Sequence, residues 1–348
     1  ILCTLAFSLL AAMSGVIISG RLPYWLGGGS EIAGDATTYF LVFMLIMPFF
    51  QLSTLSGAML KSSGDMRVPS IMSIAMCVLD VGFNYIFIFI MHLGVLGAAL
   101  GTAVSVIIGA LGQAYFAVFR NKILALRNSG ERFVWNGGYV MNALKISLPM
   151  AAQSILMGGA QIVSTIIVAP LGIFAIAANS FAVTAESLCY MPGYGIGEAA
   201  TTLVGQSIGA GQRALTKSFA HMTIWLGMGV MAFMGILMYV FAPEMIGFLS
   251  PVAEIRSLGT TVLRIEAFAE PFFAASIVGY SICVGAGDTL RPAIMNLFSM
   301  WLVRLTLAAL LAPRYGLPGV WFAMAVELTF RGTIFLIRIY RGRWQKKT

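Results

Sequence analysis

Long, predominantly apolar runs constrain this chain more than any other feature of its sequence. Three of them are Ile71–Ile90, Ile146–Ala169 and Leu317–Tyr340. Each is long enough to cross a hydrocarbon core of roughly 30 Å as a helix of about 20 residues. Only 10% of the 348 residues are charged, against about 25% in soluble globular domains. The runs therefore belong in a bilayer, and a soluble globular fold is excluded.

The apolar runs are continuous, which distinguishes helices from the strands of a membrane barrel. A β-barrel would show short segments in which apolar and polar residues alternate. A helix satisfies its backbone hydrogen bonds within one span, so continuous runs favour helices. About ten spans are expected, near residues 1–20, 36–59, 70–90, 94–118, 146–169, 174–204, 217–241, 258–283, 292–311 and 317–340.

Basic residues sort by loop along the chain. Fifteen of the 21 lysines and arginines fall in alternate loops and the C-terminal tail, and three fall in the opposite loops. The remaining three, Arg264, Arg304 and Arg331, lie inside expected spans. The positive-inside rule predicts a multi-pass protein of the cell membrane with a cytoplasmic C-terminus. The net charge of +8 is not gathered into a patch, so no nucleic-acid partner is expected.

The chain contains an internal repeat. Residues 48–72 read PFFQLSTLSGAMLKSSGDMRVPSIM and residues 271–295 read PFFAASIVGYSICVGAGDTLRPAIM, with nine identities in 25 positions at an offset of 223. The matches include Gly, Asp and Pro at loop positions, so shared apolar composition does not account for them. Gly ends one helix, Asp can cap the next and Pro suits its first turn.

Both copies of the Gly-Asp loop fall on the basic side, which makes the repeats parallel. The sequence therefore predicts an all-α integral membrane protein with two pseudo-symmetric helical bundles of a six-helix repeat. Residues 1–119 form a remnant of the first copy with about four helices, and residues 120–134 form a basic cytoplasmic linker. Residues 135–348 form a complete second copy with a basic cytoplasmic tail. The first copy is expected to lack about two helices at its N-terminal end.

Asp80 and Asn84 are the first candidates for a functional site. Placing an ionisable group such as Asp80 inside a membrane span costs free energy, so such a group is expected to have a function. They lie four residues apart in MCVLDVGFNYIFIF and so share one face of a helix. Together they can present oxygens to a proton or a small cation. The alternative is a structural role, in which Asp80 hydrogen-bonds across a helix pair.

Glu186 is the second candidate. It lies in FAVTAESLCYMPGYG, ahead of Pro192 and several glycines that permit a bend or close packing. A carboxylate before such a bend can bind a cationic substrate or a proton, and the alternative is a hydrogen bond that packs helices. Glu327 and Arg331 are four apart and are expected to pair with each other, whereas Glu266 and Glu270 are expected near the outer rim.

The sequence holds no convergent set of catalytic groups or metal ligands. The four cysteines, Cys3, Cys77, Cys189 and Cys283, lie in apolar spans without metal-ligand spacing. An intramembrane enzyme would need a converging nucleophile, base or metal. We therefore expect no enzymatic activity, no catalytic residue, no bound metal and no cofactor other than a coupling ion.

Several segments together resemble one transporter family. They are GDMRVP and GDTLRP in equivalent loops, MPGYGIGEAATTLVGQSIGAG in the second helix of the second copy, and MWLVRLTLA late in the chain. In order and spacing they are similar to the MATE (multidrug and toxic compound extrusion) family. This resemblance implies a parent of twelve helices in two lobes, with this chain N-terminally truncated, that exports cationic or amphiphilic compounds driven by H⁺ or Na⁺.

The resemblance also bears on the candidate residues. One branch of the family carries an Asn and an Asp four apart on its fifth helix, which implies a coupling role for Asp80 and Asn84, here in reversed order. A second branch uses acids in the C-lobe, at places that correspond to Met157 and Phe273 in this chain. The coupling ion, H⁺ or Na⁺, is therefore expected at Asp80 and Asn84, with Glu186 as a candidate substrate or proton site.

The sequence thus predicts a secondary multidrug exporter that works as a monomer among membrane lipids and antiports drug-like small molecules by alternating access. A lipid-linked oligosaccharide flippase of the same superfamily is the alternative, and it would need more basic residues in its cavity than the three within the spans. A passive channel remains a further alternative, although no selectivity-filter loop is visible in the sequence.

Overall fold

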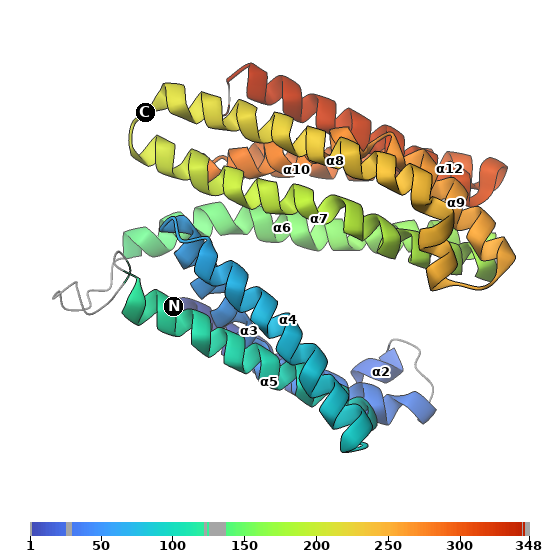
Figure 1. The fold of residues 1–348 in the computed structure, drawn as a ribbon, viewed down its shortest axis with the longest axis horizontal. Coiled ribbons are helices and arrows are strands. Elements are labelled where there is room, and N and C mark those ends of the chain that lie inside the picture. Colours follow the sequence, from blue (N-terminus) through green and yellow to red (C-terminus); the bar gives the residue numbers. More distant parts are fainter. Residues whose placement is uncertain (1, 26–29, 122–123, 125–136, 343, 345–348) are drawn as a thin grey trace. The chain divides into compact units, whose positions relative to one another are not determined.

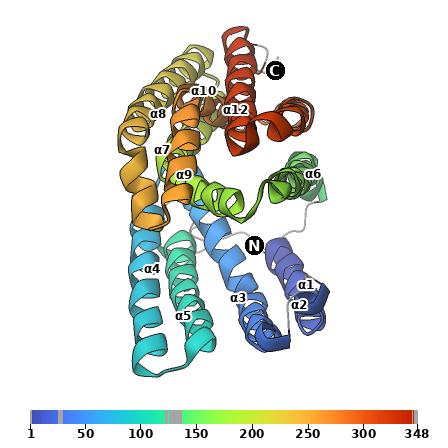
Figure 2. The ribbon, with the colours of Figure 1, turned by 90° about the vertical axis from the view of Figure 1, so that its right-hand side faces the viewer.

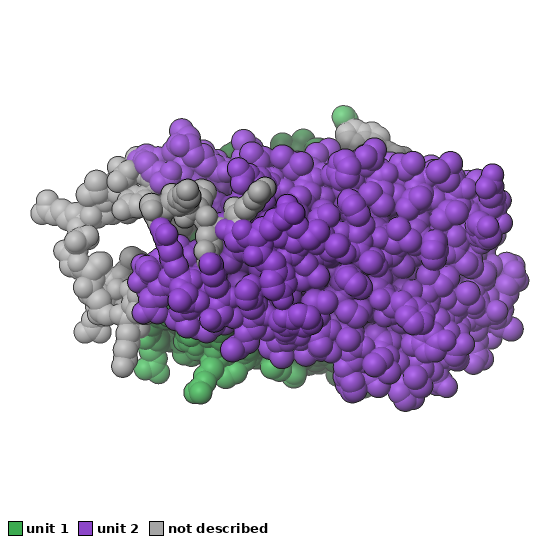
Figure 3. All heavy atoms as spheres, turned by 90° about the horizontal axis from the view of Figure 1, so that it is seen from above, with its two compact units in different colours: residues 1–134 green, residues 135–348 purple. Residues whose placement is uncertain are grey.

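The computed structural model describes residues 2–25, 30–121, 124, 137–342 and 344, and these residues form helices without strands. They divide into two compact units, unit 1 with residues 1–134 and unit 2 with residues 135–348, which are coloured separately in Figure 3. Large apolar side chains lie exposed along the helices, for example Ile173 at 82% and Val81 at 71%. A bilayer covers such surfaces, so the predicted all-α membrane fold is confirmed.

The described part of unit 1 is built mainly from long helices. In chain order they are α1 (Leu2–Ile18), α2 (Leu22–Trp25), α3 (Ser30–Ser62), α4 (Arg67–Tyr85) with its extension η1 (Ile86–Ile90), and α5 (Gly94–Tyr115) with its extension η2 (Phe116–Arg120). Figure 2 shows the order α4, α5, α3, α1 across this unit. The buried face of α5 is rich in small residues such as Gly101 and Gly109, which lets neighbouring helices approach closely.

Unit 2 holds the remaining helices (Figure 1). In chain order they are α6 (Gly137–Val168), η4 (Ala169–Leu171), α7 (Ile173–Gly209), α8 (Arg213–Leu249), α9 (Ala253–Ala267), α10 (Glu270–Gly285), α11 (Leu290–Phe298), η5 (Ser299–Arg304) and α12 (Leu305–Tyr340). Helices α7, α8 and α10 pack against one another, and α12 packs along α10 and α9.

Seven helical stretches of the described chain are long and apolar enough to span a membrane, and α9 with α10 forms an eighth that is bent by 59°. The longest stretch, Leu290–Tyr340, has 51 residues, which at 1.5 Å per residue is about 77 Å, more than twice the hydrocarbon thickness. Its backbone leaves the helical conformation at Gly316, with φ 63° and ψ −146°. It therefore supplies two passes, and with the short apolar helix α1 the described helices match the ten expected spans.

The repeat predicted from the sequence is present in the structure. Helix α3 begins and ends 223 positions before α9 begins and α10 ends. The Gly64-Asp65 and Gly287-Asp288 loops share one backbone pattern, in which the glycine has a positive φ and the Asp N–H bonds the carbonyl five residues back. This pattern is the Schellman motif, and glycine suits its left-handed position.

The two copies differ at a shared proline. Pro48 lies inside the continuous helix α3, whereas the equivalent Pro271 occupies the first turn of α10, just after the bend that separates α10 from α9. The aspartates of the two loops differ as well. Asp65 accepts hydrogen bonds from the N–H groups of Arg67 and Val68 at 3.2 Å and so caps α4, as expected. Asp288 instead pairs with Arg338 of α12.

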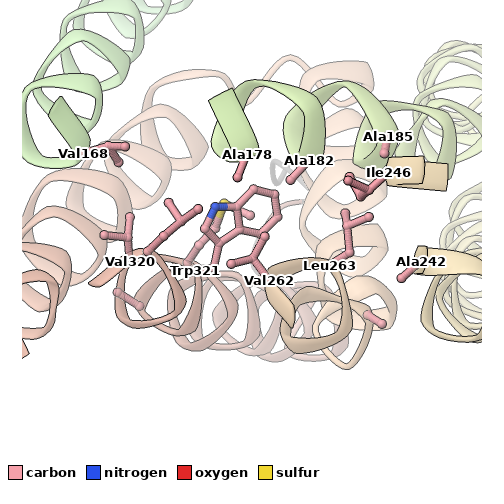
Figure 4. Packing of buried hydrophobic residues seen from close by; sticks show 14 of the residues in the cluster. Val168, Ala178, Ala182, Ala185, Ala242, Ile246, Val262, Leu263, Val320 and Trp321 are labelled. Atoms are coloured by element: carbon pink, nitrogen blue, oxygen red, sulfur yellow. The ribbon is translucent and has the colours of Figure 1, made fainter. Parts of the chain in front are cut away.

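The main core of unit 2 lies near the α8–α9 turn. Figure 4 shows Trp321 of α12 pointing towards Ala178 and Ala182 of α7. The indole of Trp321 is 2% exposed and donates a hydrogen bond of 2.9 Å to Oδ1 of Asn179. Small residues on α7 thus make room for one large aromatic ring, which fixes α12 against α7.

Candidate ion-binding site

Four glutamates from four helices lie buried inside unit 2. Glu186 of α7 is 6% exposed, and Glu266 of α9, Glu270 of α10 and Glu327 of α12 are each 0% exposed. Glu186, Glu270 and Glu327 each lie close enough to Glu266 to interact with it electrostatically. Arg304, at the end of η5, does so as well. We call the four glutamates with Arg304 and Arg331 the buried acidic cluster. Its residues lie in membrane-spanning helices, where ionisable groups are rare and costly.

The bend between α9 and α10 positions two members of the cluster. Glu266 is the penultimate residue of α9 and Glu270 is the first residue of α10. The N–H of Ala269 donates a hydrogen bond of 2.8 Å to the carbonyl of Glu266, which closes the turn between them. Pro271 lacks an N–H and is tolerated in the first turn of a helix, so it suits the start of α10. The bend places both carboxyl groups in the interior.

Glu327 is the best-partnered acid of the cluster. Its Oε1 accepts a hydrogen bond of 2.6 Å from the hydroxyl of Ser299 and lies 3.1 Å from Nε of Arg331. The pair expected between Glu327 and Arg331 is therefore confirmed, on one face of α12. Arg304 lies in the same region and its Nη2 contacts the sulfur of Met324 at 2.6 Å.

Most carboxyl oxygens of Glu266, Glu270 and Glu327 lack such partners. Both side-chain oxygens of Glu266, both of Glu270 and Oε2 of Glu327 are buried without a hydrogen bond to any described residue. A buried ionised carboxylate without a partner is strongly unfavourable. The cluster holds four carboxyl groups but only two guanidinium groups, so ionisation of all four would leave two negative charges unbalanced. Among the described residues no three acidic, His or Cys side chains form a ready metal site.

An aromatic surface adjoins the cluster. Tyr190 lies one turn after Glu186 on α7, and its ring contacts Phe273 of α10 and Tyr194 with centroid distances of 5.6 and 5.7 Å. The guanidinium of Arg331 lies 5.7 Å from the centroid of the Phe273 ring. Aromatic faces attract cations, so the surface beside Glu186 has the chemistry to accept a cationic amphiphile.

Asp80 and Asn84 lie one turn apart on α4. They belong to unit 1, whereas the four buried glutamates belong to unit 2. Both residues are half-buried, and the Oδ1 atom of each is buried without a hydrogen bond to any described residue. Gly101 of α5 leaves the space that Asn84 fills, since a Cβ there would lie 2.9 Å from Cγ of Asn84. The paired face predicted for these residues is compatible with this geometry, and their role in ion coupling stays a prediction.

Glu266 and Glu270 were expected at the outer rim of their span, and this expectation was wrong because both are fully buried. The bend at residues 267–270 turns them inward, and no local pattern in the sequence shows the direction of a bend. The available sequence signal for a bend was Glu270 directly followed by Pro271. Helix α7 stays helical through Pro192, so Glu186 lies in an uninterrupted helix.

The repeat shows that three glutamates of the cluster have no acidic counterpart in unit 1. At the offset of 223, Phe43 and Met47 of α3 stand where Glu266 and Glu270 stand in unit 2. At the offset of 222 that holds later in the copy, Ser105 of α5 stands in place of Glu327. The two copies share a backbone but carry different polar groups.

A profile of the MatE family matches residues 1–86 and 149–310 of the chain, which is more than half of it. The chain therefore belongs to the MatE family of membrane transporters, as the resemblance predicted. It is 26% identical over 351 residues to a probable multidrug resistance protein NorM of Thermotoga maritima, covering 97% of this chain and 75% of that protein. It is 24% identical to an uncharacterized transporter YisQ of Bacillus subtilis, covering 98% and 76%.

Solved structures agree on the fold. An outward-facing multidrug resistance MATE family transporter of the MOP superfamily superimposes with a TM-score of 0.92 at 18% identity, covering 99% of this chain and 77% of that one. A MOP superfamily transporter from Pyrococcus furiosus, described by a reversed polarity of its binding pocket, superimposes with a TM-score of 0.91 at 17% identity and similar coverage.

Proposed function

We propose that this chain acts in a secondary multidrug exporter of the cell membrane, which antiports cationic or amphiphilic small molecules against H⁺ or Na⁺ by alternating access. The observation that carries the proposal is the excess of buried carboxyl groups over guanidinium groups in unit 2. Protons or a cation must balance these groups whenever they are enclosed, so the cluster can bind and release the coupling ion.

Competition for the same negative charge gives the coupling its physical basis. Glu186 lies beside Tyr190, and the aromatic surface there extends to Tyr194, which is 50% exposed. A cationic substrate on this surface and an ion at Glu186 would both neutralise the same carboxyl group. Binding of one then weakens binding of the other, which is the unfavourable coupling free energy between drug and ion that an exchanger needs.

The pair Asp80 and Asn84 remains part of the proposal as a second ion site in unit 1. The exporter is proposed to work as a monomer with its C-terminus in the cytoplasm. The relatives named as multidrug resistance proteins support the substrate class. For a lipid-linked oligosaccharide flippase, the alternative, Arg331 is less suitable because Glu327 already pairs with it.

A transport assay tests the proposal and separates its two sites. The protein that contains this chain is reconstituted in proteoliposomes, and efflux of a cationic dye is measured under an imposed H⁺ or Na⁺ gradient. We expect Glu186→Gln and Glu270→Gln to reduce gradient-driven transport at least about tenfold, because a positioned ionisable group typically contributes that much or more. Glu244→Gln, at an acid of α8 outside the cluster, serves as the control and retains activity.

The same assay on Asp80→Asn locates the coupling. Loss of transport in Asp80→Asn with retention in the glutamate variants would place coupling in unit 1 and contradict the role of the cluster. Gradient-independent transport by every variant would contradict antiport itself. The imposed gradient that drives efflux identifies the ion as H⁺ or Na⁺.

A further inference from the structure

A groove on unit 2 joins α8, α9 and α12, and no residue of the buried acidic cluster lines it. Its volume is about 700 Å³, within the range of small-molecule sites. Its walls are formed mainly by apolar and aromatic side chains, with Tyr239 of α8, Phe268 after α9, and Phe322 and Val326 of α12 among them. A second hollow of about 480 Å³, between α8 and α10, shares Tyr239 and Phe268 with the groove as lining residues.

Arg264 is the charged residue in the wall of this groove. Its Nε donates a hydrogen bond of 3.2 Å to the carbonyl of Tyr239, and its guanidinium lies 5.3 Å from the centroid of the Tyr239 ring. Within the described part of the chain Arg264 has no carboxylate at ion-pair distance. Glu266, two residues further along α9, is fully buried on another face of that helix. The positive charge of Arg264 is therefore held at the groove and not neutralised there.

The position of Arg264 along its helix sets its depth in the bilayer. Tyr239 lies ten residues before the end of α8, about 15 Å along the axis at 1.5 Å per residue. Helix α8 has 37 residues and a length of about 55 Å, so it exceeds a hydrocarbon core of roughly 30 Å by about 12 Å at each end if it is centred. This places Tyr239 and Arg264 near the boundary between acyl chains and headgroups.

We propose that the groove binds an anionic phospholipid from the leaflet at the α8–α9 end of unit 2. The guanidinium of Arg264 pairs with the lipid phosphate, and one acyl chain lies in the groove between α9 and α12. The second chain lies in the neighbouring hollow, so that the lipid straddles Tyr239 and Phe268, whose rings pack edge to face at 5.6 Å.

Charge and shape together favour this occupant. Arginine binds phosphate with two parallel charge-assisted hydrogen bonds, which are strong at the edge of a low-dielectric region. The same charge repels the cationic compounds proposed as transported substrates, so the groove is unsuited to them. The apolar walls give a free inorganic anion little to contact, whereas acyl chains fill them.

Lipid titration of purified protein tests the proposal. Binding of phosphatidylglycerol and of phosphatidylcholine to the detergent-solubilised protein is measured by native mass spectrometry, as occupancy against lipid concentration. We expect phosphatidylglycerol to bind about tenfold more tightly than phosphatidylcholine. Both lipids carry the phosphate, but in phosphatidylcholine the choline ammonium offsets its negative charge and repels the guanidinium of Arg264. Arg264→Gln should abolish this preference, and Arg264→Lys should retain part of it.

Two further variants keep the test decisive. Arg256→Gln makes the same charge change on α9 at an exposed residue outside the groove, and it should keep the preference for phosphatidylglycerol. Ala325→Trp fills the groove while leaving Arg264 in place, and it should weaken binding of both lipids. Each variant is first shown to keep its melting temperature.

Three outcomes would overturn the proposal. The first is that Arg264→Gln keeps the same preference for phosphatidylglycerol as the unchanged protein. The second is that Arg256→Gln loses this preference to the same extent as Arg264→Gln. The third is displacement of the lipid by inorganic phosphate at matched concentration, which would indicate a simple anion site. Because the readout is lipid binding, failure here is distinguishable from failure of the proposed antiport.

Discussion

The ion pair of Glu327 and Arg331 illustrates how single residues control the stability of the buried acidic cluster. The pair lies 3.1 Å apart and is almost fully buried. Removing one partner of a buried pair leaves an uncompensated charge, whereas replacing both by apolar groups removes the desolvation cost together with the attraction. The contribution of the pair therefore depends on both residues and not on either alone.

A double-mutant cycle at this pair gives a prediction at the residue scale. Arg331→Met should destabilise the protein by about 3–5 kcal/mol, because buried Glu327 then loses the guanidinium that it contacts. The double variant Glu327→Leu with Arg331→Met should regain most of that loss. Thermal unfolding in detergent measures both. If the loss of stability in the double variant equals the sum of the losses in the two single variants, the residues do not interact.

At the scale of whole helices, the close contact between α10 and α12 depends on a glycine. A Cβ at Gly332 of α12 would overlap the carbonyl oxygen of Phe272 on α10. Backbone atoms cannot move aside as a flexible side chain can, so the two helices can approach this closely only with glycine there. The helix pair carries Glu270 and Glu327, and its spacing therefore also sets the geometry of the cluster.

Gly332→Ala is expected to destabilise the protein by about 1–3 kcal/mol, the usual cost of inserting a methyl group into a packed interface. Gly229→Ala on α8 is the matched control, because a Cβ at Gly229 meets no atom within 4 Å. That control should be neutral or stabilising by up to about 1 kcal/mol, since alanine favours a helix over glycine. Equal melting temperatures for the two variants would contradict close packing at Gly332.

At the scale of the whole molecule, the charge distribution predicts which ends of the helices face the cytoplasm. The turn before α8 belongs to the basic side, and the turn between α8 and α9 belongs to the opposite side. Because α8 crosses the bilayer between them, these two turns must be exposed on different faces of the membrane.

Thiol labelling tests this topology. In a variant whose four cysteines are replaced by alanine, Val252→Cys should react with a membrane-impermeant maleimide added to intact cells. Ala214→Cys should react only after the membrane is permeabilised. The reverse pattern would show that the chain is inserted with the opposite orientation, and labelling of both sites in intact cells would show that α8 does not cross.

Most of the helical architecture could be predicted from the sequence, because the length and composition of an apolar run decide whether it spans a bilayer. The pairing of Glu327 and Arg331 was predictable for a similar reason, since residues four apart on a helix are neighbours. The burial of Glu266 and Glu270 was not, because it depends on the 59° bend between α9 and α10. The two helices that meet at the bend pack against α7, α8 and α12, and no local pattern shows such contacts between distant parts of the chain.

The two Gly-Asp loops with the same hydrogen bonds point to a duplicated ancestral gene. Before the duplication, a half-length polypeptide would have carried one set of ionisable groups, and two copies of it would have been chemically identical. Fusion into one chain released that constraint. Glu266, Glu270 and Glu327 now stand in one half where Phe43, Met47 and Ser105 stand in the other, so the halves diverged in chemistry on a scaffold that both retained.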